Sequence, residues 1–481
     1  MTFIISIKRL TAILLIIGTV SCGKSYLELD SRYTAAKDAI KDLNSMSAAL
    51  NGAYSLLQSD SYYGRSFIVI PELISDNGMI SIVHSSRYTN INANTTVSTD
   101  SYVTGLWNQL YSLVVNCNFL IQEGGKIQFP VNDEKAGKDK LAESYSLRAL
   151  ANFDLVRAFA QPYSNTADAS HPGVPLVTES GTEVKDIRKP PRATVAEVYA
   201  QIVADCLKAI ELFEQGTGTI KSTRFNVYGA KALLSKAYLY MGDWPNAEKF
   251  ANDVIEDGGY TLLTNANLVS NFKVKGNSEA IFEIANNTAD NLGTNSLANF
   301  YSQLGYGDII ATENLYNIYS ATDVRRQFVA RSKRNRVGGE DPAYIISKYG
   351  NIVDFEENTK VLRLAEVILI RAEARARQTG KETLAQADYL TVAKRGDLNV
   401  LPTTSTGTEL VNIILRERRK ELAFEGNQLF DLNRSKLNWT KYRSGAADIA
   451  FTAQSNRTIL PIPRRETNLN PNVQQNPGFG L

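Results

Sequence analysis

The residues with the most recognisable chemical spacing stand near the start of the chain, in the segment 1–25. Residues 18–25, GTVSCGKS, match the spacing of a phosphate-binding P-loop, in which amides at the start of a helix hold a phosphate. Such a loop must open a helix. The residues that follow, YLELDSRY, are poor formers of the first helical turns. The surrounding sequence therefore argues against a nucleotide site.

The same segment also has the parts of an export signal. Lys8 and Arg9 form a basic start, residues 10–20 form an apolar run, and small residues lead into Cys22. A run of eleven residues is too short to span a hydrocarbon core of roughly 30 Å. We therefore predict a signal peptide over residues 1–21.

Cys22 is the predicted first residue of the processed chain. A cysteine at this place is typical of a lipobox, where the thiol is acylated (a palmitate-type lipid), although Thr19 stands where that pattern usually has leucine. The alternative is an ordinary secretory signal in which Cys22 is incidental. Processing here would leave 50 basic and 50 acidic residues. Bulk charge then gives no reason to expect nucleic acid as a partner.

Few residues elsewhere would support enzyme chemistry. Only two histidines occur, His84 and His171, and no cysteine spacing resembles a zinc site, so we predict no metal and no cofactor. Cys117 and Cys206 stand in apolar helical sequence and are predicted to be buried free thiols, with one disulfide as the alternative. Abundant carboxylates leave a glycosidase pair open. None stands in the apolar sequence that would mark a general acid, so we predict no catalytic residues.

The tyrosines point to binding. The chain has 23 Tyr and 3 Trp, and many tyrosines stand in two polar stretches, residues 75–100 and 286–351. An aromatic face can stack on the C–H face of a sugar while Asn, Asp and Arg bond its hydroxyls. The alternative is that most of these rings pack between loop and body. Because long loops in compact domains commonly carry function, we expect the binding surface there.

Helical patterns surround these loops and must position them. Apolar spacing predicts helices over 35–57, 102–122, 135–159, 194–213, 226–241, 247–256, 362–378, 383–394 and 408–424. Thr194 and Glu197 predict a capping box, and the glycines of 257–260 predict a helix end. No Gly/Ser or Pro linker divides the chain. We therefore predict a single mainly α-helical body over residues 22–481.

Two helix pairs resemble tetratricopeptide repeats, in which small residues let paired helices approach closely. Residues 226–263 hold two helices joined by MGDWP, with small and aromatic residues near the repeat spacing. Residues 362–394 form a looser pair that is rich in alanine. An ordinary αα-hairpin is the alternative for either pair alone. Two such pairs favour a repeat-like scaffold.

The segment 416–434, RERRKELAFEGNQLFDLNR, is basic and could be mistaken for a polyanion site. Glu417, Glu421, Glu425 and Asp431 stand at helical spacing among its arginines. We therefore expect these charges to pair within the molecule.

This segment also carries a resemblance to a known family. Residues 419–432, RKELAFEGNQLFDL, resemble the carboxy-terminal signature of the SusD/RagB family, outer-membrane lipoproteins of Bacteroidetes-type bacteria. The tail 460–479 is similar to that family's tail. Further matching segments are 50–54, 63–64, 107–111, 117–118, 147–156, 173–176 and 242–244. In combination they extend from Cys22 to Leu481.

The resemblance implies a SusD-like fold, in which a tetratricopeptide-like scaffold supports a loop-rich, irregular binding half. Residues 22–220 and 221–481 would be its two parts, the second holding the middle insertion. It implies a cell-surface, lipid-anchored protein of the outer membrane that captures a glycan. The glycan would pass to a SusC-like TonB-dependent barrel without catalysis. Alternatives are RagB-like peptide capture, a surface glycoside hydrolase and a scaffold for partner proteins.

Site residues follow the resemblance only loosely. Family contacts come from the loop before the helix at 102–122 and from the middle insertion. In this chain those regions supply the candidate ligand-binding residues Asp76, Asn77, Arg87, Tyr88, Tyr301 and Tyr306. Neither region contains tryptophan, which argues against a broad aromatic arc.

Overall fold

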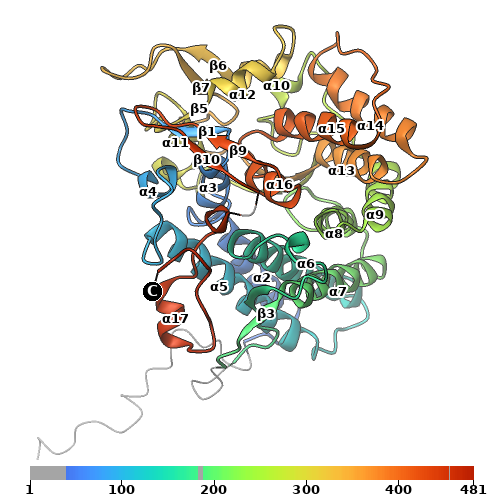
Figure 1. Ribbon diagram of the computed structural model, residues 1–481. Coiled ribbons are helices and arrows are strands. Elements are labelled where there is room, and N and C mark those ends of the chain that lie inside the picture. The colour runs from blue at the N-terminus through green and yellow to red at the C-terminus, as the bar shows by residue number, and fades with distance from the viewer. Residues whose placement is uncertain (1–38, 182–187, 454, 481) are drawn as a thin grey trace, which may run out of the picture. The chain divides into compact units, whose positions relative to one another are not determined.

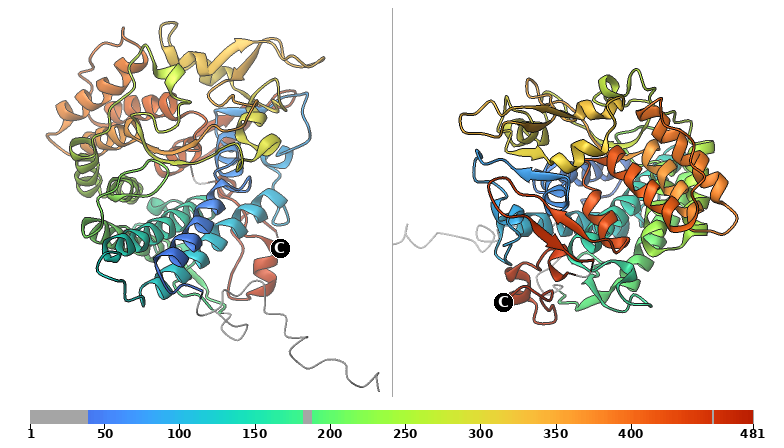
Figure 2. Two further views of the ribbon diagram at one scale, coloured as in Figure 1. Left: turned by 180° about the vertical axis from the view of Figure 1, so that it is seen from behind. Right: turned by 45° about the horizontal axis from the view of Figure 1, so that its top comes forward.

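The computed structural model describes residues 39–181, 188–453 and 455–480. The predicted signal peptide, Cys22 and the P-loop pattern lie outside these residues. Within them, Ile40–Ser180 and Arg188–Leu481 belong to one unit, and everything below concerns that unit. It is mainly helical, as the sequence predicts, and it also contains short strands that the sequence does not predict (Figures 1 and 2).

All nine predicted helices are present; the first begins eight residues later than predicted, and the other ends differ by at most three residues. They are α2 (Leu43–Gln58), α5 (Ser101–Gly124), α6 (Glu134–Phe159), α7 (Val195–Glu214), α8 (Val227–Met241), α9 (Trp244–Asp257), α13 (Leu364–Ala376), α14 (Glu382–Gly396) and α15 (Gly407–Leu422). Shorter helices are α3 (Ser66–Ile74), α4 (Thr89–Asn92), α10 (Leu268–Asn271), α11 (Leu297–Tyr301), α12 (Glu313–Ile318), α16 (Gln428–Arg434) and α17 (Arg464–Leu469). The prediction of a mainly α fold is confirmed.

The local end signals act as predicted. At the start of α7, the Thr194 hydroxyl accepts from the Glu197 N–H, and the Glu197 carboxylate accepts from the Thr194 N–H at 2.7 Å. The α9 helix ends before Gly258, and Gly259 takes a positive φ of 70°. The α2 helix begins later than predicted because Asp42 and Ser45 form a capping box there.

The two helix pairs pack as expected for tetratricopeptide-like units. The α8 and α9 helices pack on each other, as do α13 and α14, and α13 also packs on α9. Small residues make this approach close: Ala247 and Ala251 are fully buried, and the Ser235 hydroxyl donates to the Ala247 carbonyl at 2.9 Å. Cys117 and Cys206 are buried free thiols, as the sequence predicts.

Strands occupy parts of both stretches that were expected to be loop. β1 (Gly78–Ile80), β5 (Ile309–Ala311), β7 (Ala343–Ile346) and β6 (Val329–Ser332) form an antiparallel sheet in that order. Three two-stranded sheets pair β4 (Ala280–Ile284) with β8 (Thr359–Arg363), β2 (Pro172–Pro175) with β3 (Arg192–Thr194), and β9 (Trp439–Lys441) with β10 (Ile449–Phe451). These strands are too short to show a clear alternation of apolar and polar residues, so the sequence pattern does not predict them. The larger sheet joins the two polar stretches, and it lies away from α7 (Figures 1 and 2).

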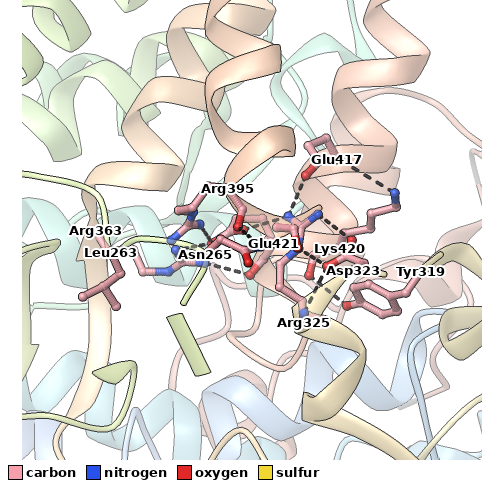
Figure 3. Close-up of polar contacts among 12 residues, drawn as sticks. Leu263, Asn265, Tyr319, Asp323, Arg325, Arg363, Arg395, Glu417, Lys420 and Glu421 are labelled. Carbon is pink, nitrogen blue, oxygen red and sulfur yellow. Dashed lines mark hydrogen bonds and ion pairs between the residues drawn. The ribbon is translucent and has the colours of Figure 1, made fainter. Parts of the chain in front are cut away.

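The basic segment forms ion pairs within the molecule, as predicted. Buried Glu421 meets Arg363 at 2.6 Å and Arg325 at 2.9 Å, and it also pairs with Arg395 (Figure 3). Burial opposes its charge, but these cations outweigh burial and hold the pKa of Glu421 well below its ordinary value. The network fixes α15 to β8, α14 and the turn at Val324–Phe328. Within the segment, Arg418 pairs with Asp431 at 3.0 Å and Arg419 pairs with Asp76 at 3.1 Å, so these charges serve the fold.

Candidate ligand-binding surface

Three loops meet beside the four-stranded sheet: residues 81–88, 302–308 and 333–340, which we call the loop cluster. The Ser81 N–H donates to the Asp308 carbonyl at 2.9 Å, which joins the first loop to the second. The Asn335 N–H donates to the Gln303 side chain at 2.8 Å, which joins the second to the third. The sheet thus brings together two stretches that lie more than 200 residues apart in sequence.

Two carboxylates inside the loop cluster are occupied by its own donors. Glu340 accepts from the Ile82 N–H and from the Ser81 hydroxyl, both at 2.7 Å. Burial opposes its charge, yet the hydrogen bonds from Ser444, Ile82 and Ser81 outweigh burial and lower the pKa of Glu340. Asp308 is buried and accepts from the Ser85 N–H at 3.0 Å. Both acids hold the loops, and neither is placed as a general acid.

Arg87 and Tyr306 form the clearest surface pair. The guanidinium carbon of Arg87 lies 4.1 Å from the ring centroid of Tyr306, within cation–π range. Arg87 also donates to the Ser85 hydroxyl at 2.7 Å, and the buried Phe300 supports Tyr306 edge-on at 5.5 Å. Both Arg87 and Tyr306 remain partly exposed. Arg87 covers one face of the Tyr306 ring, and the pair brings an aromatic ring and hydrogen-bond donors together at a partly exposed position.

A second partly exposed ring, Tyr102, lies in the first turn of α5. It stacks on the buried Tyr88 with centroids 3.9 Å apart and planes 21° apart. Tyr88 is fixed by Arg65, which donates to its hydroxyl at 2.7 Å, and by Ser66 at 2.8 Å. Burial raises the pKa of Tyr102, so its phenol stays protonated at neutral pH. The sequence analysis did not single out Tyr102. Asp100, which caps α5 at the end of the polar stretch 75–100, was the available sequence signal for this position.

Asp76 and Asn77 lie before β1, while the loop cluster follows it. Asn77 is buried; it donates to Glu72 and accepts from the Arg419 guanidinium, both at 2.8 Å. Asp76 pairs with Arg419 at 3.1 Å and accepts from Gln428 at 2.9 Å. Asp76 also lines a cavity of about 560 Å³ between α12, α15 and α16. These two residues fix β1 to the basic segment.

Tyr301 is buried in α11, where it packs edge-on against Phe424 at 5.6 Å, and burial raises its pKa well above the ordinary value. Asn77 and Tyr88 are buried as well, like Tyr301. Arg87 and Tyr306 come together on the surface, and Asp76 lines a separate cavity. Ligand contact itself stays a prediction for all six.

In residues 286–351, the positions of tyrosines in the sequence were a weak guide to the binding surface. Tyr319, Tyr344 and Tyr349 are buried, like Tyr301, so packing between loop and body accounts for them. The alternative reading of the loop tyrosines therefore holds for most of this stretch. Tyr306 differs from these four rings in that it stays partly exposed.

Within residues 39–181, 188–453 and 455–480, no group of three or more His, Cys, Asp or Glu side chains is arranged to hold a metal ion. Across the same ranges, no helix combines the length and the apolar character needed to cross a bilayer.

Known proteins resemble this chain over nearly its whole length. The family model described as "SusD family" matches residues 347–479, and the one described as "Starch-binding associating with outer membrane" matches residues 25–239. SusD-like protein P2 from Formosa agariphila is 26% identical, over 98% of this chain and 99% of its own length.

Two solved structures have the same architecture. A SusD superfamily protein from Bacteroides vulgatus is 26% identical with a TM-score of 0.84, covering 92% of this chain and 100% of its own. Another, from Bacteroides thetaiotaomicron, is 27% identical with a TM-score of 0.82, covering 91% and 100%. Matches in both halves, in sequence and in fold, agree with the helix pairs and signature segments above. This chain belongs to the SusD/RagB family.

Proposed function

We propose that this protein is a non-catalytic, lipid-anchored glycan-binding subunit on the surface of the outer membrane. It would capture an oligo- or polysaccharide and deliver it to a SusC-like TonB-dependent barrel. The observation that carries glycan binding is the partly exposed Arg87–Tyr306 pair, which is linked to the partly exposed Tyr102 through the buried rings of Phe300 and Tyr88. The matching family description, starch-binding with outer-membrane association, supports both parts.

Rigid support favours binding over catalysis at this surface. Each exposed ring lies against a buried aromatic partner, so little side-chain entropy is lost when a sugar docks. The nearby carboxylates Asp308 and Glu340 are held by loop donors, which argues against the glycoside hydrolase alternative.

Calorimetry against a polysaccharide panel tests the proposal. We expect a ligand for the wild type and roughly tenfold weaker binding for Tyr306→Ala and for Arg87→Ala, the range of one lost ring contact. Tyr316→Ala is a matched control, because Arg326 lies over Tyr316 at the same 4.1 Å outside the loop cluster. Binding of peptides alone would reject the glycan and favour RagB-like capture. Cleavage of a bound glycan would reject the non-catalytic role.

The transport step needs its own experiment. We expect the full chain, purified from its native membrane in mild detergent, to bring down a TonB-dependent barrel. The purified complex should bind the same glycan as the isolated protein. Recovery of the chain with no barrel would reject delivery while leaving glycan capture standing.

A further inference from the structure

A second cavity lies far in sequence from the loop cluster and has a distinct composition. It measures about 390 Å³ and is bounded by the segment after α6, the start of β3 and the carboxy-terminal tail. Its described lining includes one guanidinium, Arg192, one imidazole, His171, and several amide side chains, but no acidic side chain. The cavity near Asp76 differs, since its acids are paired with arginines.

Arg192 is the only charged guanidinium of this lining, and carbonyl oxygens are its partners. It donates to the carbonyls of Gly173 at 2.7 Å, Pro172 at 3.0 Å and Gln474 at 3.2 Å. A guanidinium has five N–H groups, so two remain for a ligand. Partial burial without a carboxylate lowers the pKa of Arg192 to about 10. An anion placed here would offset that unfavourable burial.

The other walls suit a hydroxylated molecule. Gln161, Asn165, Asn456 and Gln474 line the cavity, and their side-chain amides make no hydrogen bond within the described residues. Each amide can both donate and accept, as sugar hydroxyls require. Pro172, Pro191, Pro477 and Ile459 add apolar surface.

The tail wall is held in place by its own hydrogen bonds. Asn476 donates to the carbonyls of Phe159 and Leu460, both at 2.7 Å. The Gln475 amide accepts from the Ile462 N–H and donates to the Ile462 carbonyl, again at 2.7 Å. His171 contacts the Gln161 carbonyl at 3.1 Å. The cavity is therefore formed before any ligand arrives.

We propose that this cavity is a second carbohydrate site, which takes a sugar carrying an oxyanion, either a carboxylate or a sulfate. Arg192 binds the oxyanion, and the free amides bind the ring hydroxyls. The inference rests on the proposed function in that the ligand is a glycan. It adds a charge preference that the aromatic loop cluster does not supply.

Titration of the full chain with four small probes tests this site: glucuronate, glucose 6-sulfate, glucose and inorganic sulfate. We expect at least one acidic sugar to bind at least tenfold more tightly than glucose and than sulfate. Glucuronate alone would assign the carboxylate, and glucose 6-sulfate alone would assign the sulfate. Equal binding of glucose, equal binding of inorganic sulfate, or no binding of either acidic sugar overturns the proposal.

Variants locate the binding. Arg192→Gln removes the charge. Asn165→Phe fills the cavity and leaves the three hydrogen bonds from Arg192 to carbonyls in place. Each variant should weaken binding of the acidic sugar at least tenfold. Arg188→Gln is the control, because this exposed arginine pairs with Glu179 outside the cavity. Unchanged binding in Asn165→Phe overturns the assignment even if Arg192→Gln fails to fold. Tyr306→Ala should leave this binding intact, so failure at the loop cluster is distinguishable from failure here.

Discussion

At the residue scale, two buried ionisable side chains bond to β1 and to the residue that precedes it. Glu72 accepts from the Asn77 amide at 2.8 Å and from the Gly426 N–H at 2.9 Å, and burial raises its pKa to about 7. Lys441 donates to the Gly78 carbonyl at 2.8 Å, and burial lowers its pKa to about 7. Both therefore titrate near neutrality, and the stability of the strand that leads into the loop cluster depends on pH.

For Glu72, the direction in which stability changes with pH follows from its raised pKa. Its ordinary pKa is 4.5, so between about pH 4.5 and 7 the folded chain keeps a proton that the unfolded chain has released. The stability it contributes is full below pH 4.5 and is lost as pH rises through 7, with a slope of at most about 1.4 kcal/mol per pH unit. We expect Glu72→Gln to gain stability relative to wild type from pH 5 to 7 in urea unfolding curves. A constant difference over that range would contradict this assignment.

Two variants of Tyr102 distinguish a ligand contact through the ring face from one through the hydroxyl. If its exposed face stacks on a sugar, Tyr102→Phe should keep glycan affinity, while Tyr102→Ala should lose about tenfold. Calorimetry with the ligand found for the wild type measures both. Loss in the phenylalanine variant equal to that in the alanine variant would assign the contact to the hydroxyl instead.

At the element scale, the helices were predictable and the strands were not. Long amphipathic patterns and paired end signals, such as Thr194 with Glu197, fix helices locally. The three-residue strand β1 forms because it pairs with β5, whose residues lie more than 200 positions later. The pairing of Met79 with Ile310 is a tertiary contact, and no local sequence pattern predicts it. The sheet was therefore missed although every long helix was found.

The capping box at α7 has a natural control in the same chain. Thr194 accepts a hydrogen bond from Glu197, whereas Thr406 stands at the same place before α15 and makes no such bond. We expect Thr194→Ala to lower the free energy of unfolding by about 1 kcal/mol. Thr406→Ala should change it by less than about 0.5 kcal/mol. Thermal or urea unfolding distinguishes the two, and equal losses would show that the cap is not the cause.

At the scale of the whole molecule, family and fold could be anticipated from sequence, but the surface could not. The signature at 419–432 and the helix pairs indicated a SusD-like scaffold, which is confirmed. Which tyrosine is exposed depends on packing from distant segments: Phe424 packs against the buried Tyr301, while Tyr306 stays partly exposed. Tyr102 and the cavity at Arg192 likewise arise from three-dimensional proximity.

The proposed anchor is also a property of the whole molecule. If Cys22 carries the lipid, Cys22→Ser should abolish labelling with a palmitate analogue and move the protein from the membrane fraction to the soluble fraction. Cys117→Ala should retain both the label and the membrane fraction, because that thiol is buried in α5. Labelling that persists in Cys22→Ser would favour an ordinary secretory signal.

The Glu421 network has a consequence for how the molecule opens. One carboxylate binds arginines from three separate parts of the chain, so α15 cannot detach without removing a carboxylate partner from three buried cations at once. Local fraying is therefore suppressed here. Backbone amides of α13, α14 and α15 should exchange with deuterium together, at the rate of global unfolding, while those of the exposed loops exchange first.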